Sequence, residues 1–226
     1  MTAVQDFKND PVGFMQNNII VVRFGWSGEL HQAQLDAHAG SSLIGRREIL
    51  TLTKMQDNQA RGYRRGTTMG WLWGYSKTTA VYKLEYGGAA AVADQIDVYW
   101  CPYNDGSTLG VALGSAADYM FTAPMDGCSL GLGAANPDGS RLVYHSNIRA
   151  STPENQEVEQ ALELSAVNAD ALILHPNAYR NAQKGKDCKV TAFGVRNGGW
   201  HVYYQILIYE PKIPAVWKLV GVKELE

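Results

Sequence analysis

Cysteine is scarce in this chain, which contains only Cys101, Cys128 and Cys188. Three thiols cannot all pair, so a disulfide-stabilised scaffold is not expected and at least one thiol is free. The sequence has no CxxC pair and no quartet of Cys and His, which argues against a structural zinc site, and we expect no bound metal. A free thiol suits either a reducing compartment or a reactive cysteine.

A charge excess of one sign is also missing, because 20 Lys and Arg are balanced by 22 Asp and Glu. The chain therefore has no polybasic field to hold nucleic acid or an anionic membrane. Its longest apolar run is far below the length of a membrane span, and the N-terminus lacks the basic and apolar segments of a secretory signal. We expect a soluble protein without nucleic-acid or membrane partners, and export by a machine that needs no signal stays open.

What the chain does have is the composition of a globular protein, with 46% hydrophobic and 19% charged residues, and a long series of strand patterns. The alternation of apolar and polar residues that is typical of a half-buried strand is clearest over 79–86. The other expected strands are 19–26, 44–53, 71–75, 96–101, 111–113, 119–123, 129–132, 142–145, 189–196, 200–210 and 216–220.

Helical patterns are fewer. Residues 2–16 are amphipathic, and Pro11 is expected to break or kink that helix. A second helix is expected to begin after Ser151, whose hydroxyl would cap it, with Pro153 in the first turn. Its expected apolar stripe consists of Val158, Ala161, Leu162 and Ala166.

These patterns predict a β-rich α+β fold. We expect a single domain over residues 1–226, with a central two-sheet β-sandwich and peripheral helices. The polar stretch 55–66, rich in Gly and Arg, is expected to be a loop.

Cys128 is the strongest candidate for chemistry. A catalytic thiol needs a partner that lowers its pKa, usually a His, and backbone N–H groups that face the developing oxyanion. Gly127 directly precedes Cys128 and would permit a strained turn beside the thiol. The turn predicted at 136–139 folds the chain back, so a hairpin with equal arms places position 128 opposite about 145. Cys128 and His145 then meet, provided that both side chains point to the same face of the sheet.

Two other interpretations stay open. Cys128 could be a small buried apolar residue, and His145 an ordinary strand residue. Cys188 and His201 also flank a predicted hairpin turn, at 197–199, but the two arms are uneven and no glycine adjoins Cys188.

The segment around Cys128 resembles the active-site region of the cysteine-dependent protein-glutamine deamidases. This superfamily contains the chemoreceptor deamidases, the cytotoxic necrotising factors and Burkholderia lethal factor. Its members share a Thr six residues before a Gly-Cys or Ser-Cys nucleophile, with a catalytic His on the following strand. Here Thr122 stands six residues before Cys128, which follows Gly127, and Val143-Tyr144-His145 is similar to the end of the His-bearing strand in the toxins.

This resemblance covers about residues 118–147 and implies a role for each matching residue. Cys128 would be the nucleophile, His145 the general acid and base, and Thr122 a third member that orients the His. Backbone N–H groups at Gly127 and Ser129 would hold the oxyanion, and no cofactor is needed.

The same resemblance implies a toxin or effector that hydrolyses a glutamine side chain of a protein substrate, through a thioester intermediate, in a host cytosol. Likeness to lethal factor suggests a translation-initiation factor as the target, whereas likeness to the necrotising factors suggests a small GTPase.

Two alternative functions are compatible with the same sequence. The first is transglutaminase or cysteine-protease chemistry from the same Cys and His, which differs in the bond attacked or in the nucleophile that resolves the thioester. The second is a non-catalytic β-sandwich binding module that uses aromatic residues such as Trp71 and Trp73 as a platform.

Overall fold

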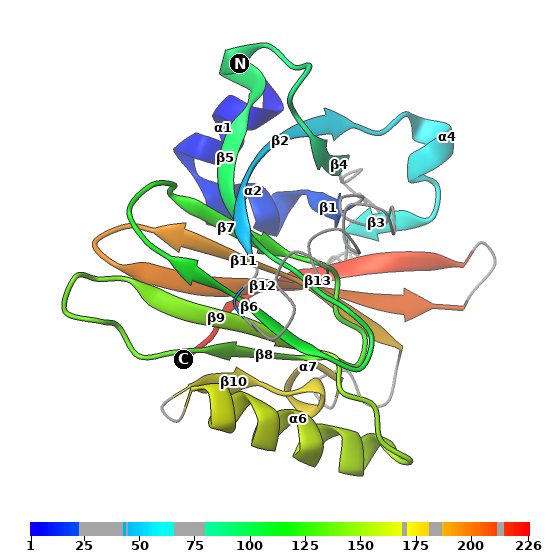
Figure 1. Cartoon of the computed structure of the whole chain (residues 1–226). Helices are drawn as coiled ribbons and strands as arrows, with labels where there is room; N and C mark the ends of the chain where they lie inside the picture. Colours follow the sequence, from blue (N-terminus) through cyan, green and yellow to red (C-terminus); the bar gives the residue numbers. More distant parts are fainter. Residues whose placement is uncertain (23–42, 44, 66–79, 169–170, 181–186, 212–214) are drawn as a thin grey trace.

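The computed structural model describes residues 1–22, 43, 45–65, 80–168, 171–180, 187–211 and 215–226, and these residues form a β-rich α+β fold built on two sheets (Figure 1). The larger sheet has, among the described residues, nine strands in the order β1 (Ile19–Val22), β4 (Val81–Tyr86), β2 (Arg46–Lys54), β5 (Ile96–Cys101), β7 (Tyr119–Thr122), β11 (Cys188–Arg196), β12 (Trp200–Glu210), β13 (Val216–Glu224) and β3 (Tyr63–Arg65). The smaller sheet has the order β10 (Leu172–Leu174), β8 (Ser129–Leu132), β9 (Arg141–Ser146) and β6 (Thr108–Leu113).

The two sheets share the main hydrophobic core of the described chain. Even-numbered residues of β11 and β12 point to this core, where they meet the inner face of the smaller sheet. The buried residues at this interface include Met120, Val190, Val202, Leu130 and Val143. The fold class predicted from the sequence is therefore confirmed: two packed sheets carry the core and the helices lie outside them.

The N-terminal helices cover the other face of the larger sheet. Helix α1 (Ala3–Asn9) and helix α2 (Pro11–Asn17) meet at Asp10, so the expected break at Pro11 is confirmed. Phe7 is fully buried against Phe121, with ring centroids 5.8 Å apart. A buried glutamine, Gln205 of β12, ties this layer to the sheet by donating to the carbonyl oxygens of Met15 and Asn18.

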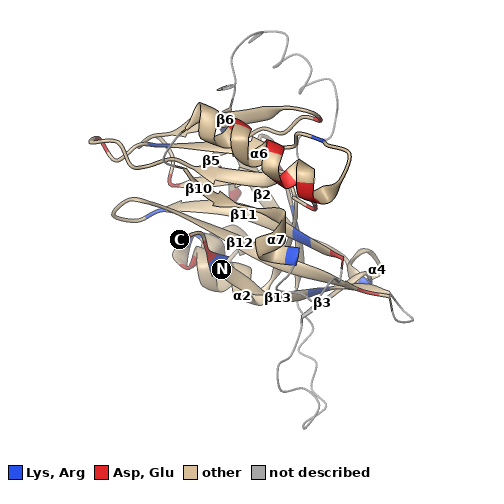
Figure 2. Cartoon of the chain, turned by 90° about the horizontal axis from the view of Figure 1, so that it is seen from below, with Lys and Arg blue, Asp and Glu red and all other residues tan. Residues whose placement is uncertain are grey.

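Helix α6 (Pro153–Val167) covers the outer face of the smaller sheet, at the opposite end of the stack of layers from α1 and α2 (Figure 1). Its N-cap is Thr152 rather than the expected Ser151, because the Thr152 hydroxyl accepts a hydrogen bond from the Asn155 N–H at 3.2 Å. Acidic residues are spread along the helix (Figure 2).

The expected apolar stripe of α6 is wrong. Val158 and Leu162 are 57% and 61% exposed, whereas Gln160 and Leu164 are fully buried. The helix turns Gln160 inward because that side chain hydrogen-bonds to the sheet beneath it, and the hydrophobic positions beside it are left facing solvent.

The segment 55–66 is not the simple loop that its composition predicts. It contains a short helix, α4 (Asp57–Ala60), and the strand β3, which pairs in parallel with β13. Pairing to a strand 150 residues later, as between Tyr63 and Trp217, has no local sequence signature. The expected strand 71–75, with Trp71 and Trp73, lies outside the described residues.

Two further short elements complete the described chain. A 3₁₀ turn, η1 (Val92–Asp94), stands in the small-residue stretch before β5, and α7 (Pro176–Arg180) follows β10. No helical pattern indicated α7 in the sequence. None of the helices in the described ranges combines the length and the apolar character needed to cross a bilayer.

Candidate functional site

A hydrogen bond between the two sheets forms the centre of the candidate site. Thr122 is the last residue of β7 in the larger sheet, and His145 lies in β9 of the smaller sheet. Both side chains point into the space between the sheets and are fully buried. Thr122 Oγ1 and His145 Nδ1 lie 2.7 Å apart, and His145 Nε2 has no hydrogen-bond partner among the described residues.

Cys128 directly precedes β8 and belongs to the same inner face. The β8 and β9 pairing places His145 opposite Leu130, so residues 128, 130 and 145 all face the larger sheet. In two antiparallel strands, residues directly opposite each other point to the same face of the sheet. A residue two positions along from the opposite residue is a diagonal neighbour on that face. Cys128 and His145 are such a diagonal pair, and no hydrogen bond joins them in the structure.

The predicted pairing of Cys128 with position 145, which assumed a hairpin with equal arms, is therefore wrong by two positions. Extending the observed register puts Cys128 opposite Asn147 rather than His145. The turn is longer than assumed, because the Asn136 N–H donates to Ser140 O and Gly139 adopts a positive φ of 78°. A type I turn followed by a left-handed glycine places the centre of the hairpin one residue later than assumed, which moves the position opposite Cys128 by two.

Asn147 is the direct partner of the thiol. Cys128 Sγ donates to Asn147 Oδ1 at 3.2 Å, and Asn147 Nδ2 donates to Asp105 Oδ1 at 2.7 Å. Arg149 pairs with the other oxygen of Asp105 at 2.6 Å, and the Tyr103 hydroxyl lies 3.1 Å from Asp105 Oδ1. The Arg149 guanidinium, followed by Tyr103 and Asn147, holds the pKa of Asp105 below its usual value, so Asp105 is a carboxylate.

The sequence reasoning missed Asn147 and Asp105. Asn147 could have been found, because it stands two residues after His145 and therefore shares its face in an extended strand. Asp105 lies between β5 and β6, far from Cys128 along the chain, and no local pattern connects the two.

The backbone on both sides of the thiol is held by side chains from the outer helices. Gly127 O accepts hydrogen bonds from Gln156 Nε2 at 2.8 Å and from Gln160 Nε2 at 3.1 Å. Cys128 O accepts one from the Tyr179 hydroxyl at 2.9 Å. The position of the cysteine is therefore fixed independently of its thiol.

Gly127 has a different role from the expected strained turn. Its φ is not in the left-handed region, where the described glycines are Gly106, Gly139 and Gly198. A Cβ at position 127 would instead lie 3.0 Å from Arg180 Nη2. The Arg180 guanidinium, the end of a flexible side chain, therefore lies beside Gly127, and its charge opposes the rise in the Cys128 pKa that burial causes.

The backbone N–H of Ser129 bonds within the ladder of β8 and β9, whereas the backbone N–H of Cys128 does not. Because the Gly133 N–H donates to Leu142 O, alternation along the ladder makes Ser129 and Ser146 a hydrogen-bonded pair. The Ser129 side chain points to the outer face, where its hydroxyl donates to Gln160 Oε1 at 2.6 Å. Cys128 occupies a position that does not bond to β9, and no acceptor for its N–H is found in the described part of the chain.

Burial dominates the electrostatics of the thiol and the imidazole. Burial, followed by the charges of Asp126 and Asp105, raises the pKa of Cys128 to about 12, against the opposing charges of Arg180 and Arg149. Burial also lowers the pKa of His145 to about 3. At neutral pH both groups are therefore uncharged in this structure, a thiol and a free base.

The competing pair is not brought together. Cys188 is opposite Ile208 in the β11 and β12 pairing, whereas His201 is opposite Val195, seven positions along the strand. The two side chains also lie on opposite faces of the sheet, because Cys188 is buried in the core while His201 is exposed and pairs with Glu224. Cys188 and His201 cannot act together.

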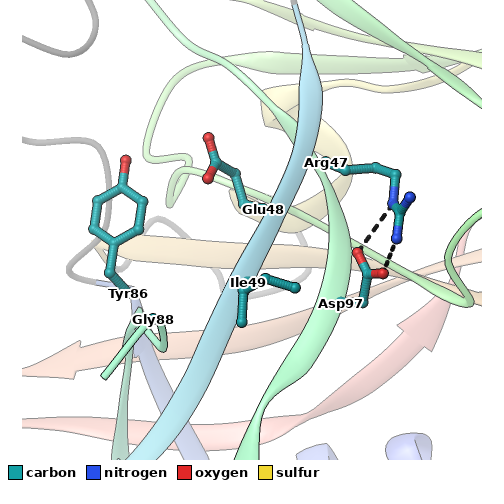
Figure 3. A pocket seen from close by; sticks show the side chains of 6 residues that line it. All are labelled: Arg47, Glu48, Ile49, Tyr86, Gly88 and Asp97. Carbon is teal, nitrogen blue, oxygen red and sulfur yellow. Dashed lines mark hydrogen bonds and ion pairs between the residues drawn. The ribbon is translucent and has the colours of Figure 1, made fainter. Parts of the chain in front are cut away.

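A cavity of about 460 Å³ lies elsewhere, on the larger sheet (Figure 3). Its lining residues come from β2, β5 and the end of β4: Arg47, Glu48, Ile49, Tyr86, Gly88 and Asp97. Arg47 and Asp97 form an ion pair across its rim (Figure 3). Neither Cys128 nor His145 lines this cavity, and its six residues include no thiol and no imidazole.

Nothing indicates a metal centre in the residues that the structure covers, where no three His, Cys, Asp or Glu side chains are grouped to hold an ion. Comparison with models of known protein families finds no match, and comparison with curated proteins finds none either.

Proposed function

We propose that this protein is a protein-glutamine deamidase in which Cys128 is the nucleophile, His145 the general acid and base, and Thr122 the residue that orients His145. The observation that carries the proposal is the 2.7 Å contact between Thr122 and His145 across the two sheets, with Cys128 on the same inner face. The resemblance of residues 118–147 to deamidases supports the same assignment.

The hydrogen bond to Thr122 is compatible with the useful tautomer of His145. When Nδ1–H donates to Thr122 Oγ1, the lone pair of the neutral imidazole is on Nε2, which has no other partner among the described residues. Burial keeps the imidazole uncharged at neutral pH, so the Nε2 lone pair is available to accept a proton, although a pKa of about 3 makes it a weak base. The thiol must first leave Asn147 Oδ1, by rotation about its own Cα–Cβ bond, to reach Nε2.

The reaction then has two balanced halves. Nε2 takes the thiol proton, the sulfur attacks the carboxamide carbon of a glutamine side chain, and the imidazolium protonates the departing nitrogen as ammonia. Water, deprotonated by the same Nε2, attacks the thioester carbon; the sulfur leaves and regains its proton, and the product is glutamate. The Cys128 N–H, which is free of the β9 ladder, supplies a donor for the oxyanion.

The preferred substrate is a protein, because the thiol is only 4% exposed and a slender side chain is needed to reach it. A glutaminyl side chain carries its carboxamide on two methylenes and is slender enough to meet this requirement. The resemblance to toxins further suggests a host protein, either a translation-initiation factor or a small GTPase.

The test is ammonia release from host-cell lysate proteins, with the converted glutamine located by mass spectrometry. Cys128→Ser is expected to abolish release, while Cys188→Ser, which changes an equally buried thiol away from His145, is expected to retain it. Iodoacetamide at neutral pH should modify Cys128 before Cys101 or Cys188, and more slowly after His145→Ala.

Retention of ammonia release in Cys128→Ser would contradict the proposal. Peptide-bond cleavage or amine incorporation in place of ammonia and glutamate would assign the same residues to a protease or a transglutaminase instead.

A further inference from the structure

We propose that Asn147, oriented by Asp105, is the residue that recognises the amide group of the substrate glutamine and rejects the product carboxylate. This inference rests on the proposed deamidase function and concerns substrate discrimination at that same site. It is carried by the chain of hydrogen bonds from Cys128 through Asn147 to Asp105.

The orientation of the Asn147 amide is determined by its neighbour. A carboxylate accepts hydrogen bonds and cannot donate one, so the group that faces Asp105 Oδ1 at 2.7 Å must be the Nδ2 amine. Arg149 and Tyr103 hold Asp105 in place and favour its charged form. Asn147 Oδ1 is therefore presented to Cys128 as an acceptor.

Asn147 Oδ1 needs a hydrogen-bond donor throughout the reaction. Asn147 is 8% exposed, and in the structure its oxygen is satisfied by the thiol. When the thiol turns to His145, Oδ1 is left buried and unpaired, which is unfavourable by about 1–3 kcal/mol. The amide N–H of a bound glutamine restores the lost hydrogen bond and compensates for the movement of the thiol.

The same arrangement disfavours the product. A glutamate carboxylate has no N–H to offer to Asn147 Oδ1, and its charge would lie near Asp105. A site built to hydrogen-bond an N–H group discriminates strongly against an analogue that lacks it. Asn147 is thus a specificity residue, and Asp105 is a positioning residue that acts through it.

The experiment measures binding through protection of the Cys128 thiol, and turnover of the glutamine peptide is measured separately. The probes are two dipeptides blocked at both ends, one with glutamine and one with glutamate, tested for their ability to protect Cys128 from iodoacetamide. In the wild type the glutamine peptide is expected to protect at a concentration at least tenfold lower than the glutamate peptide, which corresponds to about 1.4 kcal/mol.

Asp105→Asn frees the Asn147 amide to turn, because asparagine can both donate and accept. This variant is expected to reduce the preference for the glutamine peptide to less than threefold, with the larger change in KM rather than in kcat. Asn147→Ala should lose the preference too, and its thiol should be alkylated faster at neutral pH because the bond to Oδ1 is gone. The matched control is Asn136→Ala, in the exposed turn, which should behave as the wild type.

The outcomes separate this inference from the proposed function. An unchanged preference in Asp105→Asn and Asn147→Ala, together with Cys128-dependent ammonia release, would overturn the inference and leave the function standing. A preference that disappears in both variants without any ammonia release by the wild type would support amide recognition and overturn deamidation. Melting curves that match the wild type confirm that the variants are folded.

Discussion

His145 has an unusual place for a titratable side chain. It is fully buried between two sheets, bonded to Thr122 through Nδ1, and its ring centroid lies 5.3 Å from that of Tyr103. Burial disfavours the charged imidazolium and lowers the pKa from 6.5 to about 3. The same property that keeps the imidazole available as a base links the stability of the fold to pH.

We predict that the free energy of unfolding falls on acidification because of this one residue. Between about pH 6.5 and pH 3 the unfolded chain binds a proton at His145 that the folded chain does not bind. Stability therefore rises with pH across this window, with a slope that approaches about 1.4 kcal/mol per pH unit. His145→Gln should remove this contribution, as measured by urea unfolding from pH 7 to pH 4.

His201→Gln is the control for this prediction, because His201 is exposed and pairs with Glu224 at the surface. It should leave the steep acid dependence in place. Parallel stability curves for His145→Gln and the wild type would show that the imidazole is not buried as a neutral group.

At the scale of elements, α6 contributes to the site through polar rather than apolar contacts. Gln160 is fully buried and joins three parts of the chain, because it accepts from the Ser129 hydroxyl and donates to Gly127 O and Ile148 O. The helix is thus attached to the start of β8 and to the end of β9, on both sides of Cys128.

Gln160→Leu should reduce the free energy of unfolding by about 2–3 kcal/mol, because it leaves buried polar groups on Ser129 and Ile148 without partners. Urea unfolding at neutral pH measures the change. The matched variant Gln156→Leu removes one hydrogen bond to Gly127 O, which Gln160 still satisfies, and should have a clearly smaller effect. Equal losses in the two variants would mean that the Gln160 network is not a specific anchor.

At the scale of the whole molecule, the larger sheet has two different faces. One face packs against the smaller sheet and contributes Thr122 to the candidate site, and the other packs against α1 and α2. Phe7, Phe121 and Phe193 lie in the second layer, whose buried cluster includes neither Cys128 nor His145 and approaches the site only through Tyr103, the ring beside His145. We therefore expect that substitutions in the second layer change the free energy of unfolding without changing the chemistry of Cys128 and His145.

Phe7→Ala should reduce the free energy of unfolding by about 3–5 kcal/mol, because it removes a fully buried ring and leaves a cavity in its place. Below the melting temperature it should leave the pH profile of Cys128 alkylation unchanged. Leu130→Ala, which makes a cavity opposite His145, should change both stability and that profile. A shifted profile in Phe7→Ala would show that the two layers are coupled.

Within single segments, local patterns were sufficient. The strand patterns that fall within the described residues, the break at Pro11 and the turn at 136–139 all depend on neighbouring residues, and each of these is observed. The sequence spacing also placed Cys128 and His145 near one another on the two arms of one hairpin, because a hairpin needs only its own turn, whereas Thr122 was indicated only by the resemblance.

By itself, the sequence determined the β-rich class, the helix near residue 153 and the identity of the candidate thiol and imidazole, since alternation, capping and turn residues act over a few positions. Only the tertiary structure decided which groups touch. Three contacts join strands or loops that are separate in the sequence. They are the hydrogen bond between Thr122 and His145, the one between Cys128 and Asn147, and the one between Asn147 and Asp105. Such contacts depend on how two sheets pack and on one extra residue in a turn, and no local pattern carries that information.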